Sequence, residues 1–448
     1  MQRSDLSQEP SAMASRSLDR APSAKRAWYT ISLLTVLYVI SYVDRSILAL
    51  LAQPVARSLE LGDRQMAILL GLGFALFYAV GGVILAHFVD TGNRRTVVTA
   101  GVVAWSVSTV LSGFASSFWM LLLLRSGVAL GEAVLTPAAV SLIADLFPRE
   151  RRGLPVAVFT SVAGFMTIGS YVVGAMTVDL AGAVSHAVGL EPWQMTFIFV
   201  GLPGLLFGGI FALTATTPVR TAHDGAVKAV NNDASIGALL VYLRDRLRFF
   251  GPLLSLTGLN CVYSLAIVSW LPTLLVREHG LSVSKTGYLV GLVGVPAGLL
   301  GNFFWQWRAT RLQRGDPVKG VPRTLVLPAI LSAPCLAAGL MSHSMALQLA
   351  GFGLGLFMGT AFSVLGPIAI QLFGPERMRG RIMSLNYLIV ALLGYGAGPL
   401  AAVEIGALLT SSGEGLREGL ISLCVLTWPV VVLMTFAVVR NSVRAELQ

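Results

Sequence analysis

The sequence predicts an all-α integral membrane protein with twelve transmembrane helices in two six-helix halves. Of its 448 residues, 55% are hydrophobic and only 12% are charged, whereas soluble globular chains carry about 25% charged residues. Twelve apolar segments approach or exceed the length of about 20 residues that crosses a bilayer. They cover residues 28–52, 66–88, 96–115, 118–146, 154–178, 193–214, 250–271, 286–307, 323–341, 345–371, 382–403 and 418–439.

The segments group as six plus six because a long polar connection separates the sixth from the seventh. Residues 1–27 are rich in Ser, Ala, Arg and Asp, and we expect a disordered cytoplasmic tail there. Residues 28–217 then form the N-terminal six-helix half, 218–249 a cytoplasmic linker, and 250–440 the C-terminal six-helix half. A cytoplasmic C-terminal tail follows at 441–448. Two such halves around a midplane site are a common transporter architecture.

Within the linker, apolar residues recur at helical spacing. They are Ile236, Leu239, Leu240, Leu243, Leu247 and Phe250, and arginines flank them at positions 244, 246 and 248. This pattern predicts an amphipathic helix that lies along the inner membrane surface. Snorkelling arginine side chains would anchor it, and we expect a linker role in preference to a regulatory one.

Lysines and arginines are distributed unevenly between the two sides of the predicted membrane. Of the 32, 25 lie in the tails and in the loops on the N-terminal side, five lie in the opposite loops, and Arg45 and Arg125 lie within spans. Cytoplasmic loops carry the excess of positive charge, so we expect a multi-pass protein of the plasma (inner) membrane with both termini cytoplasmic. The same asymmetry explains the net charge of +10 without a nucleic-acid partner.

Four charged residues lie inside predicted spans: Asp44 and Arg45 in the first, Arg125 and Glu132 in the fourth. A charge in the hydrocarbon core is costly, so such residues are expected to face a wet cavity or one another. Arg125 and Glu132 are two helical turns apart and face the same way, about 10 Å apart along the axis. Helix rise places Asp44 and Arg125 in the outer half of a core about 30 Å thick, so the two side chains can meet.

We expect Asp44 to carry a coupling proton and Arg125 to bind an anionic group of the cargo, with a bidentate geometry that lysine cannot reproduce. Cargo that occupies Arg125 would leave Asp44 free to take up a proton. Glu132 is expected to be the next proton site or a cargo contact, and Arg45 to point either to the outer polar region or to Glu132. The alternative is a static ion pair that only helps the N-terminal half to fold.

The second half has fewer charged side chains in its predicted spans. Its polar and aromatic residues include Asn260 and Tyr263 in the seventh span and Asn386 and Tyr387 in the eleventh. Most aromatic side chains in such helices pack or anchor at the interface. As a set with Tyr42 of the first span, however, we expect these residues to contact the cargo. A cavity charged on one wall and mostly apolar on the other suits an amphiphile with an anionic head.

A second charged group lies at the predicted cytoplasmic side. Asp90, Arg94 and Arg95 lie in the short connection between spans two and three, and Asp145 lies at the inner end of span four. A carboxylate and paired arginines can cap a helix N-terminus and bind a partner acid. We expect these four residues to form a cytoplasmic gate that latches the inner side closed. The arginines alone would also fit a positive-inside anchor, and the two aspartates favour the latch.

The connection Asp90-Thr91-Gly92-Asn93-Arg94-Arg95 resembles the signature of the major facilitator superfamily, in which Asp, Arg, Gly and Arg-Arg or Arg-Lys link spans two and three. It departs from that signature at Thr91, where Arg is usual, and at Asn93, where Gly is usual. The Asn-Arg-Arg variant is similar to the spinster branch. Three further stretches share that similarity: Tyr42-Val43-Asp44-Arg45, Gly131-Glu132-Ala133 and Leu142-Ile143-Ala144-Asp145-Leu146-Phe147.

The spinster resemblance implies an amphiphilic cargo, such as a lysophospholipid or a sphingoid lipid like sphingosine 1-phosphate. Organic-anion carriers of the superfamily also show a Tyr-x-Asp-Arg stretch in span one, so a proton-coupled carboxylate carrier is the alternative. A non-transporting receptor of the same fold and an integral-membrane lipid enzyme are the remaining classes.

The sequence shows no nucleotide-binding loop, no cluster of metal-ligating residues and no nucleophile–base constellation. We therefore expect a non-enzyme without cofactor or metal, a secondary active transporter driven by a proton gradient. Charges at mid-depth in spans one and four favour transport over a receptor or scaffold. The expected partners are a small amphiphilic or anionic substrate, protons and the lipid bilayer, and we expect a monomer.

Overall fold

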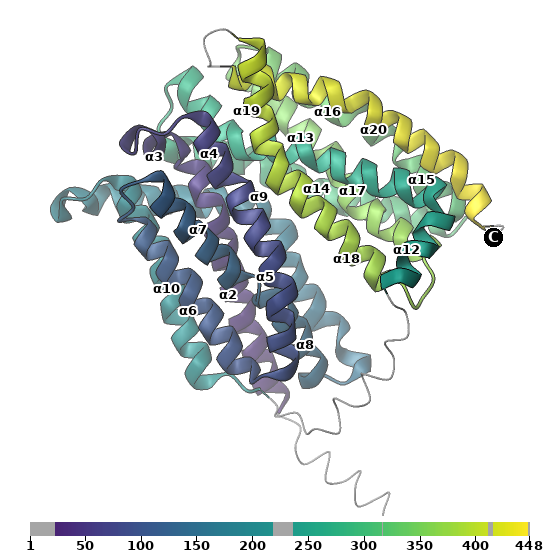
Figure 1. Cartoon of the computed structure of the whole chain (residues 1–448), viewed down its shortest axis with the longest axis horizontal. Helices are drawn as coiled ribbons and strands as arrows, with labels where there is room; N and C mark the ends of the chain where they lie inside the picture. Colours follow the sequence, from purple (N-terminus) through teal and green to yellow (C-terminus); the bar gives the residue numbers. More distant parts are fainter. Residues whose placement is uncertain (1–22, 218–235, 316, 411–414, 447–448) are drawn as a thin grey trace, which may run out of the picture.

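The computed structural model describes residues 23–217, 236–315, 317–410 and 415–446, and these residues are almost entirely helical. The helices form two groups that lie side by side, the first half of the chain in one and the second half in the other (Figure 1). Twelve segments of the described chain are long and apolar enough to cross a membrane. The predicted all-α fold with twelve spans is therefore confirmed.

Some spans are single helices, and others consist of consecutive helices with a break between them. The N-terminal half contains α2 (Ala24–Leu50), α3 (Ala52–Ser58), α4 (Asp63–Leu70), α5 (Leu72–Thr91), α6 (Arg94–Ser112), α7 (Phe118–Glu132), α8 (Leu135–Leu146), the short η1 (Arg149–Arg151), α9 (Gly153–Val188) and α10 (Pro192–Thr214). The linker contributes α12 (Ile236–Asp245). The C-terminal half contains α13 (Leu247–His279), α14 (Val283–Gln313), α15 (Pro317–Thr324), α16 (Val326–Met341), α17 (Met345–Phe373), α18 (Arg379–Ile389), η2 (Val390–Ala397), α19 (Gly398–Leu409) and α20 (Leu416–Glu446).

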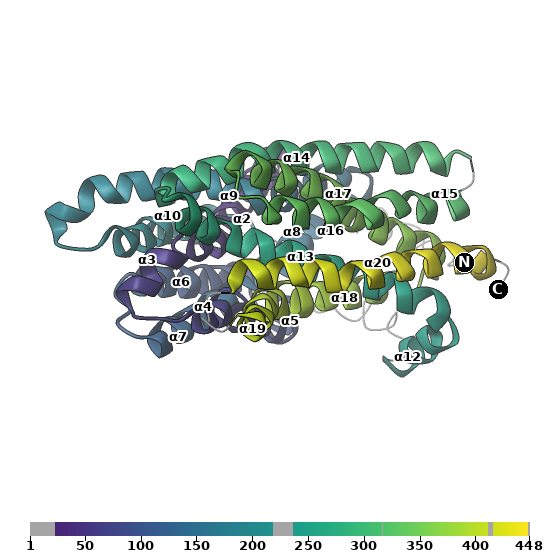
Figure 2. The same ribbon diagram turned by 90° about the horizontal axis from the view of Figure 1, so that it is seen from above.

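Several helix ends differ from the sequence prediction. Helices α9 and α13 continue to Val188 and His279, beyond the predicted span ends at 178 and 271. Helix α2 begins at Ala24, so the end of the predicted tail 1–27 is helical, while residues 1–22 lie outside the described chain. Helix α20 continues to Glu446 and takes in most of the predicted tail 441–448. The predicted amphipathic helix is present as α12 but ends at Asp245, and the chain from residue 247 onward belongs to α13. Figure 2 shows α12 at the same end of the molecule as the end of α20.

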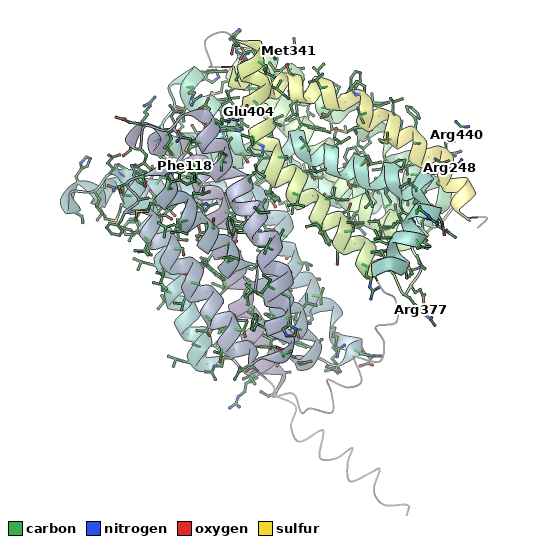
Figure 3. The ribbon with its side chains drawn as sticks, in the orientation of Figure 1. Phe118, Arg248, Met341, Arg377, Glu404 and Arg440 are labelled. Carbon is green, nitrogen blue, oxygen red and sulfur yellow. The ribbon has the colours of Figure 1, made fainter. Side chains whose placement is uncertain are left out.

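Two ends of the helix bundle can be distinguished by their arginines. We call the end at which α2 and α13 begin and α20 finishes the arginine-rich end, because 20 of the 27 lysines and arginines among the described residues lie in segments that lead to it. Arg248, Arg377 and Arg440 mark it in the C-terminal half (Figure 3). At the other end of the bundle lie the connections 59–62, 189–191 and 280–282. We call it the opposite end.

Contacts between the two halves concentrate toward the opposite end. Helix α9 packs on α14, α5 on η2, and α4 on α19. The guanidinium of Arg277 donates to both carboxylate oxygens of Asp63, at 2.8 and 2.5 Å, and Arg64 pairs with Glu404 at 2.7 Å. At the arginine-rich end, α8 and α18 make their substantial contacts within their own half, and the two groups of ribbons diverge (Figure 1).

Glycines allow the backbones of the two halves to approach closely at this contact. A Cβ atom on Gly287 of α14 would lie 2.8 Å from the carbonyl oxygen of Tyr171 on α9 and 3.2 Å from the side chain of Leu50. Gly71 separates α4 from α5, and a Cβ there would lie 2.7 and 2.8 Å from the carbonyl oxygens of Gly396 and Tyr395. The latter two residues belong to η2, a π-helical segment, a feature that is frequent at functional sites.

Gly71→Ala is expected to favour separation of the halves at the opposite end, since backbone oxygens cannot move aside for the added methyl group. A preference of about 1.4 kcal/mol for the separated state changes the ratio of states about tenfold. The measurement is thiol labelling of Leu50→Cys, in a background without native cysteines, because Leu50 is 2% exposed in the closed contact. Gly82→Ala on the same helix is the control, since its Cβ would meet nothing within 4 Å. Equal labelling of the two variants would contradict the expectation.

Candidate functional site

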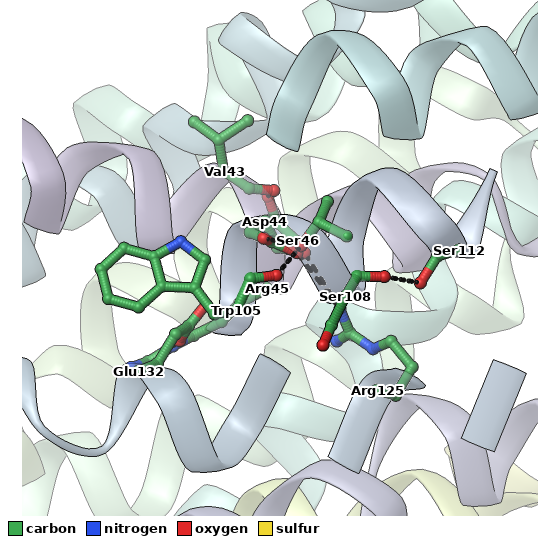
Figure 4. Close-up of polar contacts among 10 residues, drawn as sticks. Val43, Asp44, Arg45, Ser46, Trp105, Ser108, Ser112, Arg125 and Glu132 are labelled. Atoms are coloured by element: carbon green, nitrogen blue, oxygen red, sulfur yellow. Dashed lines mark hydrogen bonds and ion pairs between the residues drawn. The ribbon is translucent and has the colours of Figure 1, made fainter. Parts of the chain in front are cut away.

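Helices α2 and α7 bring four charged side chains together inside the N-terminal half (Figure 4). Asp44 and Glu132 are each 1% exposed and Arg125 is 2% exposed. The side chain of Arg45 retains 18% exposure. Two carboxylates and two guanidinium groups therefore share one buried region, which we call the charged cluster. Opposite charges compensate each other there, as burial in a membrane protein requires.

Arg45 points to Glu132, which decides between the two directions expected from the sequence. Its Nε donates to Glu132 Oε2 at 2.5 Å. The guanidinium carbon also lies 4.6 Å from the ring centroid of Tyr78, 5.2 Å from that of Tyr42 and 5.3 Å from that of Phe74. A guanidinium within about 6 Å of an aromatic face is attracted by the ring quadrupole. Three rings thus hold the one cation of the cluster that is partly exposed.

Asp44 and Arg125 do meet, but their ion pair is loose. Arg125 Nη1 lies 3.5 Å from Asp44 Oδ1 and donates to the backbone oxygen of Asp44 at 3.2 Å. The hydroxyl of Thr109 on α6 donates to Asp44 Oδ2. The carboxylate is therefore held from two helices, and one of its oxygens has only the long contact to Arg125.

Several polar atoms of the charged cluster have no hydrogen-bond partner. Among the described residues, these buried atoms include Asp44 Oδ1, Glu132 Oε1 and Arg125 Nε. An unsatisfied buried polar group costs about 1–3 kcal/mol, and more if it is charged. Such groups call for an explanation in a native structure. Each carboxylate here has an oxygen that can take a proton without the loss of an existing hydrogen bond.

Close packing of α6 on α7 fixes the position of the cluster. A Cβ on Gly131 would lie 2.6 Å from the carbonyl oxygen of Gly101 and 2.7 Å from the backbone nitrogen of Trp105. The residue before Glu132 must therefore lack a side chain. Figure 4 shows the indole of Trp105 beside this region. Helix α7 ends at Glu132, so the carboxylate projects where the span changes from α7 to α8.

The residues expected from the C-terminal half divide into buried and exposed ones. Tyr263 is 0% exposed, and its hydroxyl bonds to Asn260 and Ser332, each at 2.7 Å. Asn386 is 4% exposed and accepts a hydrogen bond from Thr257 at 2.7 Å. These bonds engage the hydroxyl of Tyr263 and the amide oxygens of Asn260 and Asn386 within their own half. Cargo contact by these three residues stays a prediction.

Tyr387 of α18 and Tyr395 of η2 are two exposed aromatic residues of the C-terminal half. Tyr387 is 59% exposed and Tyr395 is 37% exposed. Tyr395 belongs to η2, which packs on α5, the helix that carries Phe74 and Tyr78. Tyr38 packs on Tyr42 with ring centroids 5.1 Å apart. The charged cluster is thus bordered by aromatic rings from both halves.

Three residues of this site are absent from the sequence prediction: Phe74, Tyr78 and Thr109. Thr109 belongs to a run of hydroxyl residues in span three, together with Ser106, Ser108 and Ser112. That run is unusual in an apolar span and could have indicated a polar face. Phe74 and Tyr78 are four residues apart and therefore share one helix face, but nothing in their spacing indicates a cation.

The predicted cytoplasmic gate is present only in part. Arg94 is 5% exposed and forms an ion pair with Asp145, and the side chain of Asn93 accepts a hydrogen bond from the backbone of Arg95 at 3.0 Å. Both members of the ion pair belong to the N-terminal half, on α6 and α8. The side chain of Asp90 lies outside the described part of the chain. The Arg94–Asp145 pair joins α6 to α8 within the N-terminal half. Its role as a latch between the two halves stays a prediction.

Arg94→Gln is expected to destabilise the N-terminal half, because it removes the buried guanidinium that forms an ion pair with Asp145. Loss of a charged hydrogen bond costs about 1–3 kcal/mol. A lower melting temperature of the detergent-solubilised variant is the expected result. Arg95→Gln is the matched control and should melt close to the wild type. Equal melting temperatures of the two variants would show that the ion pair does not brace this half.

Comparison with known proteins agrees with this architecture. The sequence profile described as Major Facilitator Superfamily matches residues 34–399. The chain belongs to the major facilitator superfamily. This membership confirms the predicted fold and makes the chain a relative of multi-pass membrane transporters.

Relatives of this superfamily member include a pump, a spinster protein and a sugar-acid transporter. An MFS-type efflux pump of Mycolicibacterium smegmatis (strain ATCC 700084 / mc(2)155) is 30% identical over 65% of this chain and 65% of its own length. Protein spinster of Drosophila melanogaster is 26% identical over 83% of this chain and 60% of its own length. A probable galactarate/D-glucarate transporter of Escherichia coli (strain K12) is 23% identical over 90% of this chain and 91% of its own length. The match thus spans less than two thirds of the first two relatives.

A solved structure shows the same fold. It is a bacterial homolog of the human lysosomal transporter spinster in an inward-facing and occupied conformation, with a TM-score of 0.78 and 25% identity. The alignment covers 95% of this chain and 98% of that one. The resemblance of this superfamily member to the spinster branch, expected from its motifs, is therefore confirmed.

Proposed function

We propose that this protein is a proton-coupled secondary transporter that moves an amphiphilic anion by alternating access. The observation that carries the proposal is the charged cluster, with two buried carboxylates that each have an unpartnered oxygen. A static ion-pair network would be expected to satisfy these atoms. A site that exchanges protons and anions needs them free in at least one state. A lysophospholipid or a lipid like sphingosine 1-phosphate is the proposed cargo.

Arg45 is proposed as the first contact of the anionic head. Its side chain is 18% exposed, whereas Arg125 is only 2% exposed and is engaged with Asp44. The aromatic rings around Arg45 and the exposed Tyr387 and Tyr395 offer apolar surface to the rest of the molecule. The anionic head of an amphiphile would bind the guanidinium of Arg45, and its apolar part would contact the aromatic rings. Arg125 then positions Asp44 and need not touch the cargo.

Competition for Arg45 would couple the anion to a proton. In the observed arrangement Glu132 occupies the guanidinium of Arg45. An anion that binds Arg45 displaces Glu132, and the freed carboxylate, buried in a region of low polarity, takes up a proton. Asp44 provides a second proton site, loosely held by Arg125 and Thr109, and coupling in this proposal requires both carboxylates. The transporter would thus bind the proton and the anion at the same time and carry both across the membrane.

The arrangement of the halves fits an inward-facing state. We propose that the arginine-rich end is cytoplasmic, because that end carries the excess of positive charge. The contacts between halves then close the outer side, where Arg277 pairs with Asp63. The similar solved structure is also inward-facing. Both termini would lie in the cytoplasm, and the inner membrane is the proposed location.

A carboxylate carrier is the second candidate function. It is favoured by the galactarate/D-glucarate transporter that matches nearly the whole chain, and a carboxylate can bind a guanidinium as well as a phosphate can. The two candidates share the coupling mechanism and differ in the apolar part of the cargo. A sugar acid would make little use of the aromatic rings.

Uptake into proteoliposomes tests the proposed function. Purified protein is reconstituted without nucleotide, and labelled anionic lysophospholipid or D-glucarate is added with and without an imposed proton gradient. We expect gradient-dependent accumulation of the lysophospholipid. Accumulation of D-glucarate alone would establish the carboxylate carrier. Binding of either compound without any transport would indicate a receptor and overturn the proposal.

A further inference from the structure

A groove on the surface of the C-terminal half lies far from the charged cluster. It has a volume of about 470 Å³ and is lined by Arg248, Leu433, Phe436, Ala437, Arg440 and Asn441. It lies between the first turn of α13 and the last turns of α20, at the arginine-rich end. Figure 3 shows Arg248 and Arg440 next to each other there. We call it the α13–α20 groove.

Two cationic side chains, Arg248 and Arg440, line one end of the groove. The amide of Asn441 donates to the backbone oxygen of Arg248 at 2.8 Å, which ties α20 to the start of α13. Arg248 and Arg440, the residue before Asn441, both line the groove at this point. In the described part of the chain, neither forms an ion pair with a carboxylate. Arg248 also lies in the first turn of α13, where the helix dipole favours an anion.

The other end of the groove is apolar. Leu433, Phe436, Ala437 and Arg440 follow the spacing i, i+3, i+4 and i+7, which places them on one face of α20. Leu433 is 64% exposed and Phe436 is 50% exposed. Both belong to the membrane-spanning part of α20, Leu416–Ser442. Helix rise puts Leu433 about 10 Å from Arg440, so the apolar surface extends from the arginines toward the membrane interior.

We propose that the α13–α20 groove binds an anionic phospholipid of the surrounding bilayer. Its phosphate lies between Arg248 and Arg440, and one acyl chain lies along Leu433 and Phe436. Basic pockets between helices at a membrane surface are suited to anionic lipid head groups. A soluble anion would satisfy the arginines but leave the apolar surface unused. A zwitterionic lipid would bring its own cation toward two arginines.

Native mass spectrometry of the full chain in detergent tests this proposal. Phosphatidylglycerol and phosphatidylcholine with identical acyl chains are titrated, and the fraction of protein with one bound lipid is measured. We expect the double variant Arg248→Gln/Arg440→Gln to bind phosphatidylglycerol about tenfold more weakly, given the contribution of each arginine near an anionic lipid. Binding of phosphatidylcholine should not change. Arg377→Gln, at an exposed arginine of the same end outside the groove, should bind like the wild type.

Other outcomes overturn the proposal. An equal loss in Arg377→Gln would show that surface charge, and not the groove, attracts the lipid. Displacement of the lipid by glycerol phosphate at equal concentration would show a site for soluble anions. If the double variant does not fold, Phe436→Trp keeps both arginines and reports on the apolar end. Brominated phosphatidylglycerol should then quench the added fluorescence more than brominated phosphatidylcholine, and equal quenching would refute the assignment.

Discussion

Glu132→Gln is expected to remove the pH dependence of anion binding. In the proposed mechanism, Glu132 occupies Arg45 when ionised and releases it when protonated, so anion affinity should rise as pH falls. Glutamine carries no charge and competes weakly, so the variant should bind anions tightly at all pH values. At alkaline pH we expect an affinity about tenfold above that of the wild type, because a charged hydrogen bond contributes about 1.5–3 kcal/mol. Titration calorimetry with an anionic lysophospholipid over a pH series measures this.

Two further variants make the result specific to the Arg45–Glu132 pair. Glu404→Gln removes a carboxylate that pairs with Arg64 at the opposite end, and it should bind anions like the wild type. Arg45→Gln/Glu132→Gln removes the proposed anion contact together with its competitor and should bind the lysophospholipid weakly at every pH. Wild-type pH dependence in Glu132→Gln would show that the anion does not compete with Glu132.

Asp44→Asn is expected to retain exchange of cargo and to lose its accumulation. The substitution keeps the shape of the side chain and mimics the protonated acid, so cargo binding at Arg45 should persist. The amide of asparagine neither binds nor releases a proton as the carboxylate of Asp44 does. An imposed proton gradient therefore cannot drive protons through this position. Accumulation in proteoliposomes should fall to the level seen without a gradient, while counterflow exchange stays within about threefold of the wild type, or less than about 1 kcal/mol.

Thr109→Val is the matched control for Asp44. It removes the hydroxyl that donates to Asp44 Oδ2 but leaves the carboxylate in place, so gradient-driven accumulation should persist. If Asp44→Asn still concentrates cargo in response to the gradient, the proton travels elsewhere. If the variant loses exchange and accumulation together, Asp44 has a structural role only.

The number of spans and the meeting of Asp44 with Arg125 could be predicted because they depend on length, charge and helix rise. A bilayer requires long apolar segments, and buried opposite charges at similar depth find each other. The partner of Arg45 could not be predicted in this way. Successive residues of a helix point about 100° apart, so Asp44 and Arg45 face different neighbours. Which neighbour each one meets depends on how α2 is rotated against α7.

The residues of the C-terminal half show a different limit. Asn260, Tyr263 and Asn386 are polar residues in apolar spans, a pattern that suits cargo contact and internal hydrogen bonding equally. Because no water is available in the bilayer core, polar groups there must be satisfied inside the protein. The bonds from Tyr263 to Asn260 and Ser332 do this. The spacing of residues along one helix does not show which side chain of another helix will be the hydrogen-bond partner.

The π-helical segment η2 also could not be predicted from the sequence. It runs from Val390 to Ala397 and contains two glycines, and glycines in a transmembrane helix more often indicate close packing. Its contact with Gly71 depends on the relative position of the two halves. Local sequence does not determine that position, because the proposed alternating access requires the same chain to adopt at least two arrangements of its halves.

Proton movement driven by the cargo alone tests the central claim most directly. Wild-type proteoliposomes are loaded with a pH-sensitive dye and clamped electrically, and an inward gradient of anionic lysophospholipid is imposed without a pH gradient. The proposed coupling predicts that the lumen acidifies as the lysophospholipid enters, and that Glu132→Gln and Asp44→Asn abolish the acidification. Entry of the lysophospholipid at the wild-type rate with no change in lumenal pH would contradict proton coupling through the charged cluster.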